Sequence, residues 1–232
     1  MQPNGKINVV ILDDHQSIID GYVLRLSQSP KIEVVATANF ANELEPILEK
    51  FPTDVLLLDI NVPISIENAA PFPILHTISK LMELYPHLNI LVISMFAERG
   101  LIRKIMEAGA NGYILKDDRV TLIDLANVVL TIASGGIHFS QRAHQLFLSD
   151  QVTKTGSDLS IRQLQALSLC AAYPDALTTD LSKEMAIANS TFRNLLSGAY
   201  IKLNVRTRAA AIAKAQSLGI ITPVSPSAPI VG

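Results

Sequence analysis

The sequence predicts an α/β fold, with a five-stranded parallel sheet covered by helices on both faces, followed by a small all-α domain. Short apolar runs alternate five times with segments of helical period within residues 1–137. The runs are continuously apolar, as expected of strands that are covered on both faces. Strands that alternate with helices favour a parallel, doubly wound sheet. Beyond residue 157 only segments of helical period remain.

The elements follow in order along the chain. The predicted strands are 7–14, 32–38, 54–60, 89–95 and 111–116. Helical periods predict helices over 16–28, 40–51, 73–85, 98–108 and 119–134. Residues 138–157 are polar and irregular, which predicts a linker between the two domains. Four short helices are then expected over 160–172, 178–186, 190–203 and 207–217, so the second domain spans 158–222. The last residues, 223–232, contain three prolines and are predicted to be a disordered tail.

Composition narrows the class of protein. The chain has 232 residues, of which 49% are hydrophobic, so it can bury a sizeable core. The start of the chain lacks the long apolar stretch of a signal peptide, and no membrane span is expected, so we predict a cytoplasmic protein. Residues 1–157 carry a net charge of −5 and residues 158–232 a net charge of +3. An acidic part joined to a basic part indicates two modules with different partners.

Polar residues end the predicted strands at the edge where open α/β sheets bind ligands. Asp13 and Asp14 end the first strand, Asp59 the third, Ser94 the fourth and Lys116 the fifth. Three carboxylates at one edge would repel one another, and Mg²⁺ suits such a site because it binds carboxylate, water and phosphate oxygens. A lysine and a hydroxyl beside them suit a phosphoryl group. These residue types therefore suggest phosphoryl transfer with Asp59 as the nucleophile.

The stretches "ILDDH", "LLLDINVP", "VIS" and "EAGANGYILKDD" resemble the receiver domain of two-component response regulators, over about residues 5–137. The resemblance implies a flavodoxin-like fold in which Asp59 is the phosphoacceptor. It implies that Asp13, Asp14, Asp59 and the carbonyl of Asn61 bind Mg²⁺. It also implies that Ser94 and Lys116 bind the phosphoryl oxygens and that Ser94 and Tyr113 form the switch, which biases a bistable face.

Residues 159–221 resemble the LuxR-type helix-turn-helix of the NarL/FixJ group of regulators, most closely in "TFRNLLSGAYIKLNVRTRAAAI". In helical register Phe192, Leu196, Ala199 and Leu203 form one apolar stripe, so the opposite side of the helix is free for DNA. The residues expected to contact base edges are Arg193 and Asn194. Those expected to contact phosphates are Thr191, Ser197, Lys202, Arg206 and Arg208.

The match to the helix-turn-helix is imperfect. Gln163 stands where the family commonly has Glu, Ala186 replaces the usual turn glycine, and Leu195 occupies a place often held by His. The recognition helix has only two basic residues, Arg193 and Lys202. Because phosphate contacts dominate affinity for DNA, these departures leave a second interpretation open, namely a helical domain that acts through protein contacts.

The leading hypothesis is a phosphorylation-switched, DNA-binding transcriptional regulator. Its partners would be a histidine kinase or phosphotransfer protein, promoter DNA and a second copy of itself, with Mg²⁺ as cofactor. The alternative is a receiver whose degenerate helix-turn-helix binds proteins. The chain is not predicted to be an enzyme, because it contains no Gly-rich phosphate loop, nucleophile elbow or pair of metal-ligating histidines.

The segment "ISIENAAPFP", residues 64–73, is longer than its counterpart in related receivers and lacks the glycine usual after Pro63. A tolerated surface loop is one interpretation. The other is a flap over the acidic site that slows dephosphorylation or screens the kinase.

Overall fold

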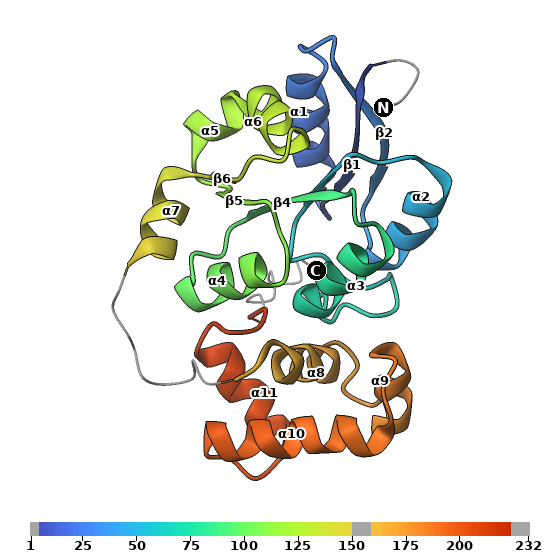
Figure 1. Ribbon diagram of the computed structural model, residues 1–232, viewed down its shortest axis with the longest axis vertical. Helices are drawn as coiled ribbons and strands as arrows, with labels where there is room; N and C mark the ends of the chain where they lie inside the picture. The colour runs from blue at the N-terminus through green and yellow to red at the C-terminus, as the bar shows by residue number, and fades with distance from the viewer. Residues whose placement is uncertain (1–4, 150–158, 224–232) are drawn as a thin grey trace, which may run out of the picture.

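The computed structural model describes residues 5–149 and 159–223 (Figure 1). The first range forms an α/β domain and the second forms a helical C-terminal domain. The α/β domain holds a parallel sheet with the strand order β2-β1-β3-β4-β5-β6. The strands are β1 (Ile7–Leu12), β2 (Ile32–Ala38), β3 (Val55–Leu58), β4 (Asn89–Ser94), β5 (Gly112–Leu115) and β6 (His138–Phe139). The five predicted strands and their parallel arrangement are confirmed, and the sheet has one strand more than predicted.

Helices cover both faces of the sheet. One face packs against α1 (Gln16–Leu26), α5 (Arg119–Ile123) and α6 (Leu125–Ala133), and the other against α2 (Leu44–Lys50), α3 (Ile74–Leu84) and α4 (Arg99–Glu107). The side chains of β1 show the division, because Val9 and Ile11 belong to the first core and Val10 and Leu12 to the second. Successive residues of a strand point to opposite faces, so a continuously apolar strand supplies both cores.

Two predicted helices are divided. A short 3₁₀ turn, η1 (Ala41–Glu43), precedes α2. The helix predicted over 119–134 is interrupted at Asp124, where α5 ends and α6 begins. Asp118 caps α5, because its side chain accepts a hydrogen bond from the Thr121 N–H.

The prediction that residues 138–157 are an irregular linker is wrong for 138–148. There the chain adds β6 to the edge of the sheet and then forms α7 (Gln141–Leu148), which packs against α4. This region has no continuous apolar run long enough to indicate a strand. The pairing with β5 creates the strand, since the Gly112↔His138 and Tyr113↔Phe139 pairs use the open edge of β5. Residues 150–157 and all but the first residue of the predicted tail lie outside the described residues.

The C-terminal domain consists of α8 (Ile161–Ala172), α9 (Thr178–Glu184), α10 (Asn189–Leu203) and α11 (Arg208–Ser217). The predicted stripe of Phe192, Leu196, Ala199 and Leu203 is buried, as expected. Phe192, Leu196 and Leu203 each contribute about 1.5–3 kcal/mol when they are fully buried. Gly198 lets α10 approach α8, because a Cβ there would meet the Gln163 side chain at 2.6 Å.

The two domains share one core. In Figure 1 the helical domain lies below the sheet, with α8 facing α3 and α4, and α10 on the far side. The cluster of buried side chains on the α3 face of the sheet continues into α8, α10 and α11. His76 of α3 lies in this boundary, where burial and the nearby Lys80 and Arg162 lower its pKa to about 4. None of the described helices has the combination of length and apolar character that crossing a membrane requires.

Ala186, which stands at the usual glycine position, has a left-handed backbone with φ of 50°. It ends α9, and the following Ile187 N–H donates to Ser182 O, the hydrogen bond that closes a helix end of this type. A left-handed conformation costs a residue with a Cβ about 1–2 kcal/mol, which glycine avoids.

We therefore expect Ala186→Gly to stabilise the chain by about 1 kcal/mol and to raise Tm. Ala213→Gly is the matched control, because Ala213 is exposed in the middle of α11, where glycine should cost about 1 kcal/mol. Thermal and urea denaturation of the three chains would measure both effects, and a loss of stability in Ala186→Gly would contradict the assigned backbone conformation.

Candidate functional site

The parallel register brings the predicted polar residues to one edge of the sheet. Leu12 of β1 pairs with Leu58 of β3, so Asp13 and Asp59 leave neighbouring strands at the same level. Ser94 at the end of β4 pairs with Leu115, and the Lys116 N–H donates to Ser94 O at 2.9 Å. The sequence prediction that these residues share the carboxyl edge is confirmed.

The Lys116 ammonium joins two carboxylates. Its Nζ donates to Asp13 Oδ2 at 2.6 Å and to Asp59 Oδ2 at 2.7 Å. The three side chains are 9%, 2% and 4% exposed, so the charges lie largely out of contact with water. Burial of charge is costly unless each charge is paired, and this lysine pairs two carboxylates at once.

The pKa values reflect this balance. Burial raises the pKa of Asp59, Lys116 opposes the rise, and the Asp13 carboxylate adds to it. Burial alone would lower the pKa of Lys116, but the Asp59 and Asp13 carboxylates outweigh it and raise the pKa. Lys116 is therefore held as a cation, and Asp59 depends on that cation for its ionised form.

Asp14 lies toward the solvent side of this site. Its Oδ1 is 2.6 Å from His15 Nδ1, and possible ligand atoms of Asp13, Asp14 and His15 all lie within 4.8 Å of one another. Carboxylate oxygens are the ligands that Mg²⁺ prefers, so the donor set of this acidic site fits that ion. The sequence predicts His15 to be a loop residue near the site rather than a catalyst, because the histidines of the chain show no ligand spacing.

Ser94 and Tyr113, which the sequence predicts to form the switch, both bond to the backbone of Phe96. Both are fully buried. Ser94 Oγ accepts from the Phe96 N–H at 3.2 Å, and the Tyr113 hydroxyl donates to Phe96 O at 2.7 Å. Burial raises the pKa of Tyr113, which is therefore a neutral donor. On the other side of the site, the Asn61 N–H donates to Asp59 Oδ1 at 3.2 Å, so the loop after β3 is tied to that carboxylate.

Ser140 is a residue that the sequence prediction missed. It is fully buried between β6 and α7. Its N–H donates to Tyr113 O at 3.0 Å, and its Oγ accepts from the Leu115 N–H at 3.1 Å. The hydroxyl thus extends the hydrogen bonding of β5 as far as the residue before Lys116. Nothing in the local sequence pattern indicates this pairing.

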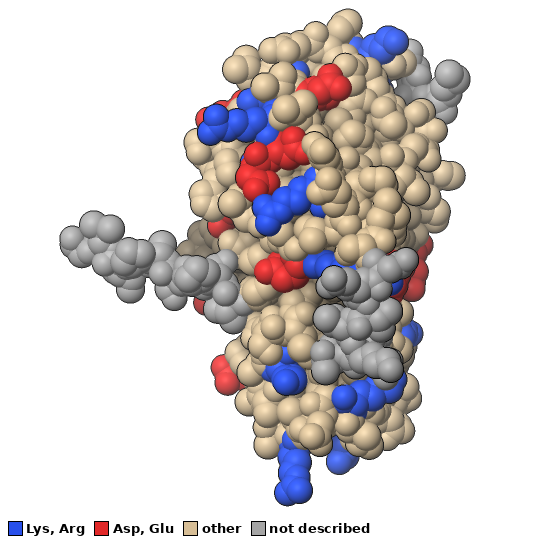
Figure 2. All heavy atoms as spheres, turned by 90° about the vertical axis from the view of Figure 1, so that its left-hand side faces the viewer, with Lys and Arg blue, Asp and Glu red and all other residues tan. Residues whose placement is uncertain are grey.

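A second group of predicted residues lies on the C-terminal domain. Thr191, Arg193, Asn194 and Ser197 are exposed on α10, and Arg206 is exposed in the turn after it. Figure 2 shows Lys and Arg side chains, rather than Asp or Glu, at the lower end of the molecule, where α10 lies in Figure 1. These five side chains are free to meet a polyanion.

Arg208 and Lys202, two residues predicted to contact phosphates, form hydrogen bonds within the C-terminal domain. The Arg208 guanidinium donates to Ala176 O, Cys170 O and Tyr173 O at 2.8–3.3 Å, so it holds the end of α8. The prediction that Arg208 faces DNA is therefore wrong in this structure. Lys202 donates to Gln163 Oε1 at 3.1 Å. The same oxygen accepts from the Ser160 N–H, so Gln163 completes the cap of α8 and binds α10.

The fold and the acidic site agree with a comparison against protein families. Residues 9–127 match the response regulator receiver domain family, which is more than half of the chain. The chain therefore belongs to that family, and the α/β domain is its receiver domain.

Relatives resemble the chain over nearly its whole length. The transcriptional regulatory protein DegU of Brevibacillus brevis is 27% identical over 226 residues, with 89% of this chain and 92% of DegU covered. The transcriptional regulatory protein MctR of Rhizobium johnstonii is also 27% identical, with 97% of this chain and all of MctR covered. The solved structure of RcsB from Salmonella enterica serovar Typhimurium bound to promoter P1flhDC has a TM-score of 0.62 at 22% identity, covering 91% of this chain and 99% of RcsB. That likeness shows the two-domain fold.

The lysine is the group that keeps the acidic site stable. We expect Lys116→Met to lower the free energy of unfolding by about 3–5 kcal/mol, because it leaves two buried carboxylates without their partner. Added Mg²⁺ should recover part of the loss, since a divalent cation replaces the missing charge. Lys183→Met is the control, because Lys183 forms an exposed ion pair with Asp180 that should be worth less than about 1 kcal/mol.

Urea denaturation with and without Mg²⁺ measures this difference. If the two variants lose the same stability, or if Mg²⁺ stabilises both equally, Lys116 does not hold the site together.

Proposed function

We propose that this chain is a DNA-binding transcriptional regulator that is controlled by phosphorylation of Asp59. The observation that carries the proposal is the Lys116 ammonium bonded to Asp13 and Asp59 at the carboxyl edge of a receiver-family sheet. The relatives named as transcriptional regulators, and the exposed polar side of α10, support the output by DNA binding. Such a protein acts in the cytoplasm, where its kinase and its promoter meet it.

In the proposed reaction, an Asp59 carboxylate oxygen forms a bond to phosphorus. The bond between phosphorus and the donor breaks, and its electron pair leaves with the imidazole of a histidine kinase or phosphotransfer protein. Lys116 would move from the carboxylates to a phosphoryl oxygen, and the Ser94 hydroxyl would bind another. Asp13, Asp14, Asp59 and the Asn61 carbonyl would hold Mg²⁺, which when bound neutralises phosphoryl charge.

The switch follows from the contacts of Phe96. If Ser94 turns its hydroxyl toward a phosphoryl oxygen, the Phe96 N–H loses its partner, and the Tyr113 hydroxyl bonds to the carbonyl of that same residue. A change at Asp59 is thereby passed to the loop between β4 and α4. The two-state element is this loop with Tyr113, whose populations phosphorylation would bias.

For the output, Arg193 and Asn194 would read base edges, while Thr191, Ser197 and Arg206 would contact phosphates. The activated chain would bind as a homodimer with one α10 in each half-site. A second candidate, an output through protein contacts, has one observation in its favour. The Arg208 guanidinium is bound to three carbonyls within the domain, which leaves one cation fewer for the phosphate backbone.

Phosphorylation can be tested directly. Acetyl phosphate with Mg²⁺ should add one phosphoryl group to the chain, and Asp59→Asn should abolish the addition because the nucleophilic oxygen is lost. Asp117→Asn is the control, since Asp117 is an exposed carboxylate next to Lys116 in sequence and pairs with Arg142 at the surface. Intact-mass spectrometry reads the result, and equal labelling of Asp59→Asn would overturn the assignment of the phosphoacceptor.

The output can be tested by selecting DNA bound by the full chain from a genomic library. For a selected site, Arg193→Ala should weaken binding by about 1–3 kcal/mol and relax the preference at one position. Lys214→Ala, an exposed substitution on α11, should leave that preference unchanged. Binding is followed against salt concentration, because displaced counterions make true DNA binding fall steeply with added salt. If no sequence is selected and affinity does not depend on salt, the protein-contact function replaces this one.

A further inference from the structure

Residues 64–73, the insertion recognised in the sequence, form a loop that is closed at its base. Pro63 and Pro71 form an isolated antiparallel bridge. The start of the loop is bonded to η1. The Ala41 N–H donates to Pro63 O and the Asn42 N–H donates to Ile64 O, both at 3.0 Å. The loop begins five residues after Asp59 and leads into α3. Its position is therefore fixed relative to the receiver sheet.

The tip of the insertion is bonded to the other domain. Asn68 Nδ2 donates to Ala172 O at 3.2 Å. Ala172 is the last residue of α8, and the carbonyls of a final helical turn have no partner within the helix. Asn68 is itself held in place, because its Oδ1 accepts from the Ala70 N–H at 2.9 Å and its N–H donates to Ser65 O. One domain thus supplies a C-terminal cap to a helix of the other.

The second half of the insertion packs against the same helix. Pro71 and Phe72 lie with Ser168 and Ala171 of α8 and with Thr222, near the end of the described chain. Phe72 is 4% exposed, and its carbonyl accepts from the Thr222 hydroxyl at 3.4 Å. An apolar ring and polar groups therefore face the same partner, as in a specific interface.

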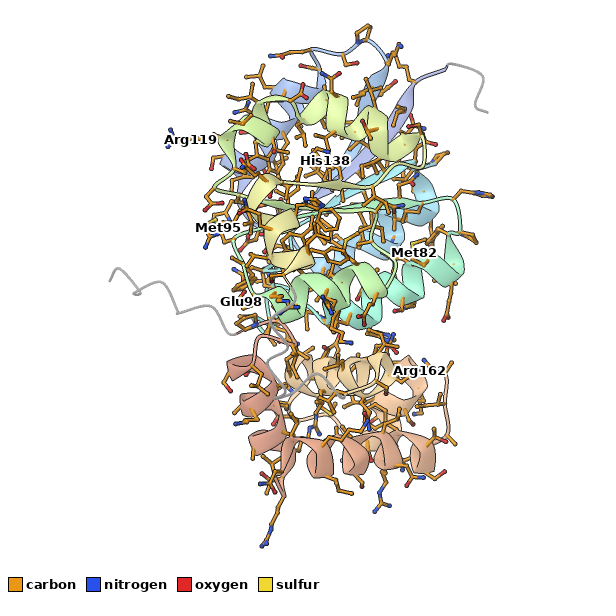
Figure 3. The ribbon with its side chains drawn as sticks, turned by 60° about the vertical axis from the view of Figure 1, so that its left-hand side comes forward. Met82, Met95, Glu98, Arg119, His138 and Arg162 are labelled. Atoms are coloured by element: carbon orange, nitrogen blue, oxygen red, sulfur yellow. The ribbon has the colours of Figure 1, made fainter. Side chains whose placement is uncertain are left out.

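The C-terminal segment Leu218–Thr222 also contacts the receiver domain, at the start of α4 and at the insertion. Gly219, with φ of 60°, lies so close to Glu98 that a Cβ would meet Glu98 Cγ at 2.6 Å. A Cβ added at Gly100, near the start of α4, would likewise meet Gly219 O at 3.0 Å. Figure 3 shows Glu98 where α4 begins, beside the end of the helical domain, and Arg162 on the side of α8 that faces the sheet. The segment thus lies between α4 and the insertion.

The domain boundary also contains a cavity. It has a volume of about 410 Å³ and lies between α2, α3 and the insertion on one side and α8 and α9 on the other, with Ile64, Phe72, Tyr173 and Glu184 among its lining residues. The contacts between the two domains include those of α3, the insertion and the C-terminal segment. The idea that the insertion is a flap over the acidic site finds no support, since none of its hydrogen bonds within the described chain reaches Asp13, Asp59 or Lys116.

We propose that the insertion is an interdomain clasp, which caps α8 through Asn68 and seats Phe72 against it, so that the C-terminal domain is held by the loop that begins five residues after Asp59. The clasp leaves the exposed side of α10 uncovered. The clasp therefore fixes how the exposed side of α10 is oriented relative to the receiver domain, and it leaves that side accessible. The inference concerns docking alone and stands whether or not the domain binds DNA.

The test measures the distance between the domains in the full chain. Spin labels are attached at Gln28→Cys in the receiver and Ser190→Cys in the C-terminal domain, both exposed positions, while the native Cys170 is fully buried. Double electron–electron resonance should give one narrow distance distribution. Asn68→Ala should add a second, broader population, with the undocked fraction rising roughly two- to ten-fold for the loss of one hydrogen bond.

Ile66→Ala is the matched control, because Ile66 lies in the same loop but is 80% exposed. Phe72→Ala is a second clasp variant, and circular dichroism confirms that each variant is folded. The proposal requires that Asn68→Ala and Phe72→Ala both broaden the distribution and that Ile66→Ala does not. A narrow distribution in every variant would assign docking to α3 alone. A broad distribution in the doubly labelled chain without a clasp substitution would show that no clasp exists. Either result overturns the proposal.

Discussion

The ion triad of Lys116, Asp13 and Asp59 is the interaction on which the rest of this structure depends. Two carboxylates at a nearly dry sheet edge would repel each other, and one ammonium between them makes the arrangement stable. Under the proposed function the same arrangement would also be reactive, because a phosphoryl group would draw the lysine away from the carboxylates. A phosphoryl group on Asp59 would take over the lysine and disturb every group that is bonded nearby. Stability of the resting site and its readiness to change therefore have one cause.

Two series of hydrogen-bonded residues connect the triad to other parts of the chain. One runs through Ser94 and Tyr113 to Phe96, and β5 extends it to Ser140 and the start of α7. The other runs along the loop after β3, from Asp59 through the Asn61 N–H to the insertion and α8. Each route ends at a part of the chain that joins or holds the C-terminal domain. The fold thus connects the acidic site to the C-terminal domain on both sides.

The C-terminal domain uses its cations for two purposes. Arg208 and Lys202 bind carbonyl or amide oxygens within the domain, and Lys202, Arg193 and Arg206 are exposed. A guanidinium that satisfies Cys170 O and Tyr173 O at the end of α8, and Ala176 O in the loop that follows, replaces capping that the sequence after Ala172 does not provide. Of the departures from the family pattern, Gln163 caps α8 and accepts from Lys202, and Ala186 takes up a left-handed backbone at the place where glycine is usual.

The sequence by itself determined the five main strands, the acidic edge and the buried stripe of α10. Those features follow from local periodicity and from the rule that parallel strands present their carboxyl ends together. Only the tertiary structure decided that β6 joins the sheet, that Arg208 turns inward and that the insertion reaches α8. Each of these depends on pairing between distant residues, such as Tyr113 with Ser140, Arg208 with Tyr173 and Asn68 with Ala172. Local patterns cannot show which unsatisfied backbone group a side chain will find, because that partner is brought near only by folding.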